Sequence, residues 1–281
     1  MFHRVRAPRL FLAVLLLTLL AVPVSAAPEQ PTIIGGQTAT AGEFPYMVAL
    51  VQAGGGQFCG GSLITANWVL TAAHCFFNEQ NQQDTFAADV NIVAGSVDLS
   101  GGGGQTVGVT RIVHQGYDQN QLLDIALLEL AQPITLGGGA GLIAFNAAPA
   151  TPATGAPATI TGWGATAPDG NAPSDQLLKV QLPVVACDQG DDPALFICAG
   201  GVEGEDSCQG DSGGPLVVAD GVGSFLQIGV TSSGPETCAQ AGQYGIYTRV
   251  SQYSDWINQT VGVNMPPIEA DNYVYLPAVS R

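Results

Sequence analysis

Short runs of apolar and β-branched residues recur along most of the chain, separated by spacers rich in glycine, proline and polar residues. In the first part they are residues 46–52 (YMVALVQ), 58–65 (FCGGSLIT), 68–74 (WVLTAAH), 90–96 (VNIVAGS), 106–113 (TVGVTRIV) and 124–130 (DIALLEL). In the second part they are residues 158–163 (ATITGW), 177–185 (LLKVQLPVV), 214–219 (GPLVVA), 225–232 (FLQIGVTS) and 245–250 (GIYTRV). Such runs predict β-strands. No helical segments alternate with them, which argues against a parallel α/β sheet.

The remaining segments of this region have other patterns. Residues 136–158, rich in Gly, Ala, Pro and Thr, are typical of a connector between the two sets of strands. Residues 251–262 (SQYSDWINQTVG) are the best helix candidate, with Ser251 or Ser254 able to cap the first turn. Residues 263–281 have no such pattern. We expect a flexible tail there, with a docking or sorting segment as the alternative.

The N-terminus has the parts of a secretory signal. Arginines within the first ten residues precede an apolar run at residues 10–24, and a small-residue cleavage site lies at residues 24–26. The apolar run is shorter than the ~20 residues that a membrane span needs. We therefore expect a signal peptide at residues 1–26, a short propeptide at residues 27–32 and a secreted, extracellular protein. An uncleaved membrane anchor is the alternative.

The charge and the cysteine content of the chain indicate which kinds of partner and which compartment suit it. The chain has 7 basic and 23 acidic residues, a formal net charge of -16, so it would repel the phosphates of nucleic acid. That charge would attract a cationic partner, or would simply keep the protein soluble outside the cell. The 6 cysteines of a secreted chain predict three disulfides, and spacing alone leaves about fifteen sets of pairings open.

The sequence GDSGG around Ser212 matches the G-x-S-x-G nucleophile elbow of α/β-hydrolases. That fold needs a histidine after the serine, but His3, His74 and His114 all precede it, so an elbow-type esterase is excluded. His3 is lost with the signal. The base for a nucleophilic Ser212 is then His74 or His114, in the chain order His, Asp, Ser. Asp124, directly before an apolar strand, is placed to be buried at a strand end and to orient an imidazole.

Several motifs in this order resemble the trypsin-like serine proteases of the chymotrypsin fold. They are IIGG, CGGSLI, WVLTAAHC, DIALLEL, TGWG, ICAG, DSCQGDSGGPLV and GIYTRV. The resemblance covers residues 33–262. It implies an all-β fold of two antiparallel six-stranded β-barrels with a short C-terminal helix, the barrels spanning roughly residues 33–140 and 141–262. The active site would lie between them.

The resemblance also implies roles for individual residues. Ser212 would be the nucleophile, His74 the general base and then acid, and Asp124 the group that orients His74. The backbone N–H groups of Gly210 and Ser212 would form the oxyanion hole. Ser232 falls where the family has a serine near the triad acid.

A substrate-binding set follows from the same resemblance. Asp206 would form the floor of the specificity pocket, where it would pair with an Arg or Lys side chain of the substrate. The other members of the set are Ser207, Ser232, Gly234 and Gly245. The alternative for Asp206 is an ordinary acidic loop.

Activation is implied at Ile33. In the family, a new α-amino group at this position pairs with the equivalent of Asp211. The preceding residue is Thr32, so an enzyme that cuts after Arg or Lys would not activate itself, and we expect a separate activating protease.

The family's disulfide pattern applies here too. The implied pairs are Cys59–Cys75, Cys187–Cys198 and Cys208–Cys238. Ser233 stands where the family usually has a tryptophan, which predicts weaker apolar binding beside the pocket. The segment after residue 95 lacks the family's calcium-binding glutamates, so no metal and no cofactor is expected. Tyr244 matches members of the family that bind sodium nearby.

The sequence therefore predicts a secreted, monomeric serine endopeptidase that hydrolyses peptide bonds through an acyl-enzyme, after Arg or Lys, in protein or peptide substrates. No nucleic-acid or membrane partner is expected. The alternatives are a catalytically silent homologue that acts as a binding module, and an active protease of non-tryptic specificity.

Overall fold

The computed structural model describes residue 1 and residues 33–117, 123–147, 152–188, 190–221 and 223–262. Apart from residue 1, the expected signal peptide and propeptide lie outside the described residues, and so does the expected tail. No helix among the described residues is long and apolar enough to cross a membrane.

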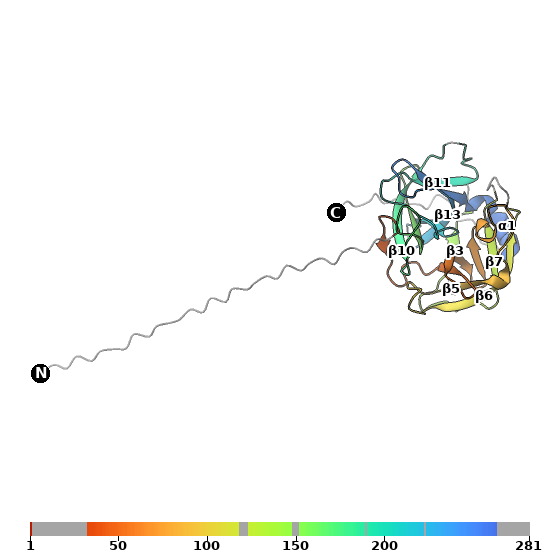
Figure 1. The fold of residues 1–281 in the computed structure, drawn as a ribbon, viewed down its shortest axis with the longest axis horizontal. Coiled ribbons are helices and arrows are strands. Elements are labelled where there is room, and N and C mark those ends of the chain that lie inside the picture. Colours follow the sequence, from red (N-terminus) through yellow and green to blue (C-terminus); the bar gives the residue numbers. More distant parts are fainter. Residues whose placement is uncertain (2–32, 118–122, 148–151, 189, 222, 263–281) are drawn as a thin grey trace. The chain divides into compact units, whose positions relative to one another are not determined.

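Six antiparallel strands form a first closed barrel, in the order β2-β3-β4-β7-β6-β5 (Figure 1). They are β2 (Met47–Gln52), β3 (Gln57–Thr65), β4 (Trp68–Thr71), β5 (Val90–Ala94), β6 (Gln105–His114) and β7 (Ala126–Leu130). In β5, Val90, Ile92 and Ala94 alternate inward and pack in the core of this barrel. Two short 3₁₀ helices, η1 (His74–Phe76) and η2 (Ala87–Asp89), lie between its strands.

The second barrel closes in the order β9-β10-β11-β14-β13-β12, with β12 pairing back to β9. Its strands are β9 (Pro157–Gly162), β10 (Leu178–Val185), β11 (Phe196–Gly200), β12 (Pro215–Ala219), β13 (Phe225–Ser233) and β14 (Tyr244–Arg249). Alternate β10 residues, among them Leu178, Val180 and Leu182, are buried in its core. Burial of each such side chain stabilises the fold by about 1.5–3 kcal/mol. The expected fold of two six-stranded antiparallel barrels is confirmed.

Two short strands join the second barrel from elsewhere in the chain. β1 (Gln37–Thr38) pairs antiparallel with β10, although it precedes the first barrel in sequence. β8 (Ala144–Phe145) pairs parallel with β13. Residues 33–38 therefore pack against the second barrel, while a division of the chain near residue 140 would group them with the first.

The C-terminal helix is present, but its start differs from the expectation. The 3₁₀ helix η3 (Val250–Tyr253) leads into α1 (Ser254–Val261). The residue at the N-cap position is Tyr253, and no side chain caps this end. The Ser254 hydroxyl donates to the Ser251 carbonyl instead, so the prediction that either serine caps the helix was wrong.

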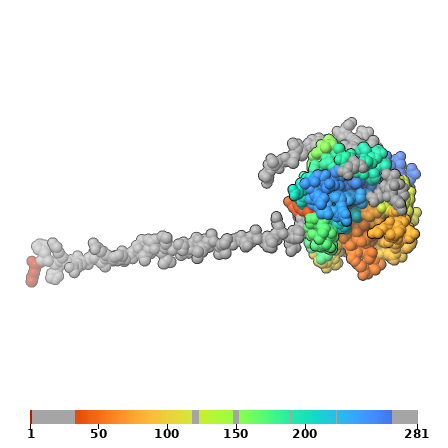
Figure 2. Space-filling model, turned by 45° about the horizontal axis from the view of Figure 1, so that its top comes forward, coloured from red at the N-terminus to blue at the C-terminus, as the bar shows by residue number. Residues whose placement is uncertain are grey.

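The two barrels pack directly against each other (Figure 2). One buried cluster combines Leu70 and Leu127 of the first barrel with Val217 and Val230 of the second. A buried polar contact crosses the same interface, where the Ser62 hydroxyl donates to Gln227 Oε1 at 2.6 Å. Such a contact holds two faces in one register, because both polar groups would be costly to leave unpaired.

Candidate active site

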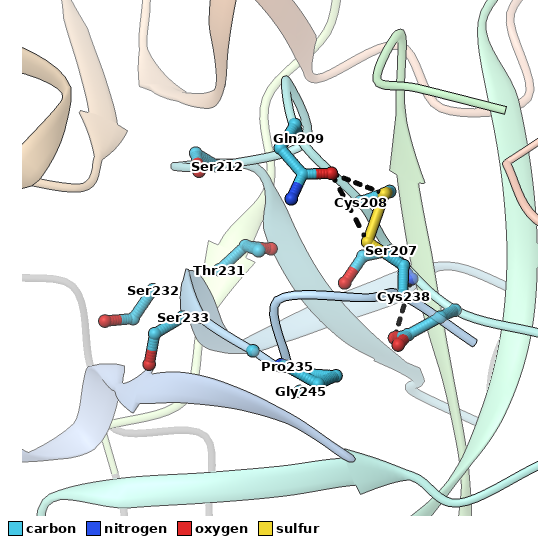
Figure 3. A pocket seen from close by; sticks show the side chains of 12 residues that line it. Ser207, Cys208, Gln209, Ser212, Thr231, Ser232, Ser233, Pro235, Cys238 and Gly245 are labelled. Carbon is cyan, nitrogen blue, oxygen red and sulfur yellow. Dashed lines mark hydrogen bonds between the residues drawn. A yellow bond between two sulfur atoms is a disulfide. The ribbon is translucent and has the colours of Figure 1, made fainter. Parts of the chain in front are cut away.

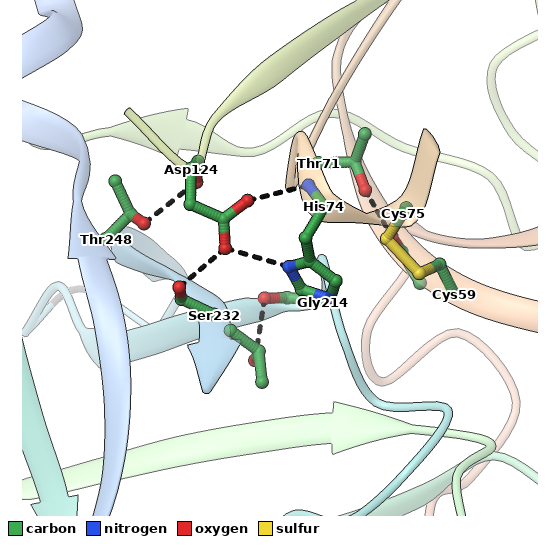
Figure 4. Close-up of polar contacts among 10 residues, drawn as sticks. Cys59, Thr71, His74, Cys75, Asp124, Gly214, Ser232 and Thr248 are labelled. Atoms are coloured by element: carbon green, nitrogen blue, oxygen red, sulfur yellow. Dashed lines mark hydrogen bonds and ion pairs between the residues drawn. A yellow bond between two sulfur atoms is a disulfide. The ribbon is translucent and has the colours of Figure 1, made fainter. Parts of the chain in front are cut away.

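An imidazole, a carboxylate and a hydroxyl form a chain of close contacts at the junction of the barrels (Figure 4). His74 Nδ1 lies 2.8 Å from Asp124 Oδ2, and the Ser232 hydroxyl donates to the same oxygen at 2.5 Å. The His74 backbone N–H donates to Asp124 Oδ1 at 2.8 Å. The Asp124 side chain is fully buried, whereas 24% of the His74 side chain is exposed. One carboxylate thus fixes both the ring and the backbone of His74 and leaves the ring's other edge accessible.

Local structure explains how these residues meet. β4 ends at Thr71, and His74 begins the 3₁₀ turn that follows. The Cys59–Cys75 disulfide ties that turn to β3. Asp124 lies two residues before β7, and the Thr248 hydroxyl of β14 donates to the Asp124 backbone carbonyl at 2.8 Å.

The turn that carries Ser212 has an uneven hydrogen-bond pattern. Each backbone carbonyl from Cys208 to Ser212 accepts a hydrogen bond: from the N–H groups of Asp211, Ala165, Gly214 and Gly60, and from the Gln57 side chain. The N–H groups of Gly210 and Ser212 have no acceptor among the described residues. Since backbone donors near a protein interior are normally paired, two free ones in one turn can serve an incoming oxygen.

Glycine is required at two points of this turn. Gly210 has φ 96° and Gly213 has φ 77°, in the left-handed region. A Cβ on Gly213 would lie 2.2 Å from Thr71 Oγ1 and 2.6 Å from the Gly60 carbonyl. This close approach sets the Ser212 turn of the second barrel against the His74 side of the first.

A pocket begins at Ser212 and extends into the second barrel (Figure 3). Its lining residues are Asp206, Ser207, Cys208, Gln209, Ser212, Thr231, Ser232, Ser233, Gly234, Pro235, Cys238 and Gly245. All five expected substrate-binding residues are among them. The pocket therefore brings Asp206 and Ser212 into one cavity.

Asp206 is 3% exposed. Its Oδ1 accepts from the Ser207 N–H at 2.8 Å and its Oδ2 from the Ala239 N–H at 3.0 Å. Burial raises the pKa of this carboxyl above its ordinary value, and the two backbone hydrogen bonds act in the opposite direction. The carboxylate is held in one orientation but lacks a counter-charge from the described residues.

Asp211 is a second buried carboxyl near the pocket. It is 0% exposed and accepts from the N–H groups of Gly164 and Cys208, both at 2.9 Å. Burial raises its pKa to about 7. A Cβ on Gly164 would lie 2.5 Å from Asp211 Cγ, so the glycine leaves room for this carboxyl. Ile33 is also 0% exposed and lies in the core of the second barrel.

The three disulfides are those that the resemblance implied. They are Cys59–Cys75, Cys187–Cys198 and Cys208–Cys238. The last one joins two walls of the pocket. No cysteine in the described part of the chain is free.

The remaining expectations concern the surroundings of the pocket. Ser233 ends β13 and lines the pocket, where an aromatic side chain would add apolar area. The Tyr244 hydroxyl donates to Asp188 Oδ1 at 2.5 Å, across the loop that the Cys187–Cys198 disulfide closes. Among the described residues, the one group with metal-ligand spacing is Cys59, His74 and Cys75, whose cysteines are already joined as a disulfide.

Sequence reasoning missed two contacts at this site. Thr248 supports Asp124, and the Gln57 side-chain amide donates to the Gly210 carbonyl at 2.7 Å. Thr248 is followed by the charged Arg249 within the same strand, so its polar side chain does not stand out in the sequence. Gln57 opens an ordinary strand 153 residues before Gly210, and nothing local marks it.

Comparison with known proteins agrees with the geometry. The Trypsin family model matches residues 33–257. The chain is 41% identical over 244 residues to Trypsin-1 of Astacus astacus, an alignment that covers 80% of this chain and 98% of that protein. It is 39% identical over 238 residues to the trypsin of Saccharopolyspora erythraea, covering 82% and 98%. It is also 36% identical over 244 residues to human Serine protease 56, covering 83% of this chain but 39% of that longer protein.

Proposed function

This chain belongs to the trypsin family of serine proteases, and from that premise we propose that it is a secreted, monomeric endopeptidase that cleaves protein or peptide substrates after Arg or Lys. The observation that carries the proposal is the pocket that contains both Ser212 and the buried carboxyl of Asp206. The trypsins among its relatives support this choice of substrate.

In the proposed acylation step, Ser212 Oγ attacks the carbonyl carbon of the scissile bond while His74 Nε2 takes the hydroxyl proton. Asp124 accepts from the N–H at Nδ1, which holds the required tautomer and stabilises the imidazolium that forms. The negative charge on the substrate oxygen develops beside the free N–H groups of Gly210 and Ser212. His74 then donates its proton to the leaving amine, and the C–N bond breaks to leave an ester on Ser212.

Deacylation repeats these steps with water as the nucleophile. His74 removes a proton from the water, which attacks the ester carbonyl. The same two N–H groups stabilise the second oxyanion, and the proton returns to Ser212 Oγ as the acid product leaves. No bound cofactor is part of this scheme.

Asp206 would select the side chain before the scissile bond. A buried carboxylate without a counter-charge is costly, and an incoming guanidinium or ammonium removes that cost. The bound cation would also lower the raised pKa of Asp206, because an opposite charge favours the ionised form.

Activation would follow cleavage between Thr32 and Ile33. The new α-amino group of Ile33 would pair with Asp211 and hold the turn that presents Ser212. Asp211 is suited to this role because it is fully buried with a raised pKa, so a nearby ammonium would stabilise its ionised form. Since Thr32 is neither Arg nor Lys, a separate protease would make the cut.

The test is cleavage of matched peptides that carry Arg, Lys, Phe or Ala before the scissile bond. The protein is first shown by N-terminal sequencing to begin at Ile33, and Ser212→Ala is the control. We expect cleavage after Arg and Lys alone, lost in the control. Cleavage after Phe or Ala would refute the role of Asp206 and support a non-tryptic protease. No cleavage by correctly processed protein would favour a silent homologue acting as a binding module.

A further inference from the structure

The hydrogen bond from Gln57 stands apart within the Ser212 turn. Among the described residues, backbone N–H groups hold the other carbonyls from Cys208 to Ser212, while a side chain alone holds that of Gly210. The donor is Gln57 Nε2, at 2.7 Å. Gln57 is the first residue of β3, so this contact reaches from the first barrel to the turn of the second.

Gly210 is held on both flanks by different barrels. The preceding peptide contains the Gln209 carbonyl, which accepts from Ala165 of the second barrel at 2.7 Å, and the free N–H of Gly210. The following peptide contains the Gly210 carbonyl, which Gln57 holds. Gly210 has φ 96° and, as a glycine, wide backbone freedom. If only one of its two neighbouring peptides were held, the other peptide could still rotate.

We propose that Gln57 is a positioning residue for the oxyanion hole: its amide locks the Gly210 carbonyl, and this keeps the Gly210 N–H directed at the reacting carbonyl oxygen. The inference rests on the proposed protease function and goes beyond it, because it makes the first barrel a part of the oxyanion hole. Gln57 touches no reacting atom and acts through Gly210.

The structure offers a matched control for this role. Gln105, the first residue of β6 in the same barrel, also donates its side-chain amide to a backbone carbonyl, that of Thr135, at 2.8 Å. Gln105 Oε1 also accepts from the Thr135 N–H at 2.8 Å, so Gln105→Leu removes at least as much side-chain hydrogen bonding as Gln57→Leu. Only Gln57 touches the turn that carries Ser212.

Two ligands distinguish a specific defect of the oxyanion hole from a general disturbance of the active site. A peptide boronate with an arginine side chain forms a tetrahedral adduct with Ser212 and uses the oxyanion hole, whereas benzamidine needs only the Asp206 pocket. For Gln57→Leu we expect kcat and boronate affinity to fall about 10-fold, less than the about 10²–10³-fold that follows loss of a whole oxyanion donor. KM and benzamidine affinity should stay unchanged. Gln105→Leu should have the kcat, KM, boronate affinity and benzamidine affinity of the wild-type protein.

A second variant tests the direction of the hydrogen bond. Gln57→Glu keeps the shape but replaces the donor with an acceptor that faces the Gly210 carbonyl. Its kcat relative to wild type should be lowest at pH 8 and recover toward pH 5, as the new carboxyl gains a proton that it can donate. Thermal unfolding of both variants shows that they are folded.

Several outcomes would overturn the inference. A wild-type kcat and boronate affinity in Gln57→Leu would do so, and so would an equal loss of benzamidine affinity or an equal defect in Gln105→Leu. If the kcat of Gln57→Glu relative to wild type did not change with pH, that result would also contradict the inference. A wild-type protein that binds neither ligand and cleaves nothing would overturn the proposed function, and this inference with it, so the two failures are distinguishable.

Discussion

Replacement of Asp206 by asparagine removes the charge in the pocket while it nearly preserves the side-chain shape. In the structure both carboxylate oxygens accept from backbone N–H groups, those of Ser207 and Ala239. An amide can accept at its oxygen alone, so its NH₂ group would face one of these N–H donors. The structural cost is about 1–3 kcal/mol, offset at neutral pH by the loss of a buried charge. Asp206→Asn should therefore fold.

Its effect on cleavage after Arg should be large. Removal of one partner of a buried ion pair costs about 3–5 kcal/mol, which is roughly a 150- to 5,000-fold loss of kcat/KM. A substrate with a neutral residue before the scissile bond makes no such pair, so its kcat/KM should change little. The pH dependence follows from the raised pKa of Asp206. For wild-type protein, KM for an Arg substrate should rise as the pH falls toward that pKa, because the cation binds to the ionised carboxylate.

The assay is steady-state cleavage of paired Arg and Ala peptides, with Glu205→Gln as the matched control. Glu205 precedes Asp206 directly but does not line the pocket that begins at Ser212. Its removal changes the net charge equally and should alter kcat/KM by less than about 3-fold, the range of a screened surface charge. An equal loss in the two variants would refute the reasoning, since long-range attraction would then account for the preference.

Other substitutions test the remaining contacts. Ser232→Ala removes the hydrogen bond to Asp124 Oδ2 and should lower kcat about 10-fold in peptide turnover, since a hydrogen bond to a charged group contributes about 1.5–3 kcal/mol; an unchanged kcat would contradict this. In the uncleaved chain, burial raises the pKa of Asp211 to about 7, above ~3.9 for an unfolded chain, so its contribution to stability should be lost as the pH rises between these values. In Asp211→Asn, the unfolding free energy from urea titration should fall less between these pH values than in the wild-type protein. An equal fall in both proteins would contradict this prediction. Conversion of Cys208 and Cys238 to serine opens a loop of sequence separation 30 and should lower the unfolding free energy by about 3–4 kcal/mol in denaturant titration.

Strand positions were largely readable from the sequence, because the side-chain period of a strand is local. The run at residues 177–185 predicted a strand, and β10 lies there with side chains that alternate between buried and more exposed positions. β11 (Phe196–Gly200) escaped notice as a strand, since all its residues are buried and no alternation marks it. The C-terminal helix was expected, while its uncapped start was not.

The chemistry of the site was partly readable in the same way. The order of the histidines relative to Ser212 excluded an elbow-type hydrolase, but it left His74 and His114 open until the family motifs were considered. In the structure His114 ends β6 and its ring packs against that of Phe77. Of the two candidates, His74 is the one whose ring and backbone contact Asp124.

The sequence by itself determined most of the strand segments, the candidate nucleophile and, through family motifs, the acid of the pocket and the cysteine pairs. Tertiary structure alone decided which groups meet across the barrels. Asp124 accepts from Ser232 over 108 residues and Gly210 from Gln57 over 153. The physical reason is that periodicity reports which face of a strand is buried, whereas these contacts depend on how two closed barrels dock. In the Ser212 turn, the carbonyls of Gly210 and Ser212 accept from Gln57 and Gly60 of the first barrel, and no local pattern in the sequence reports those contacts.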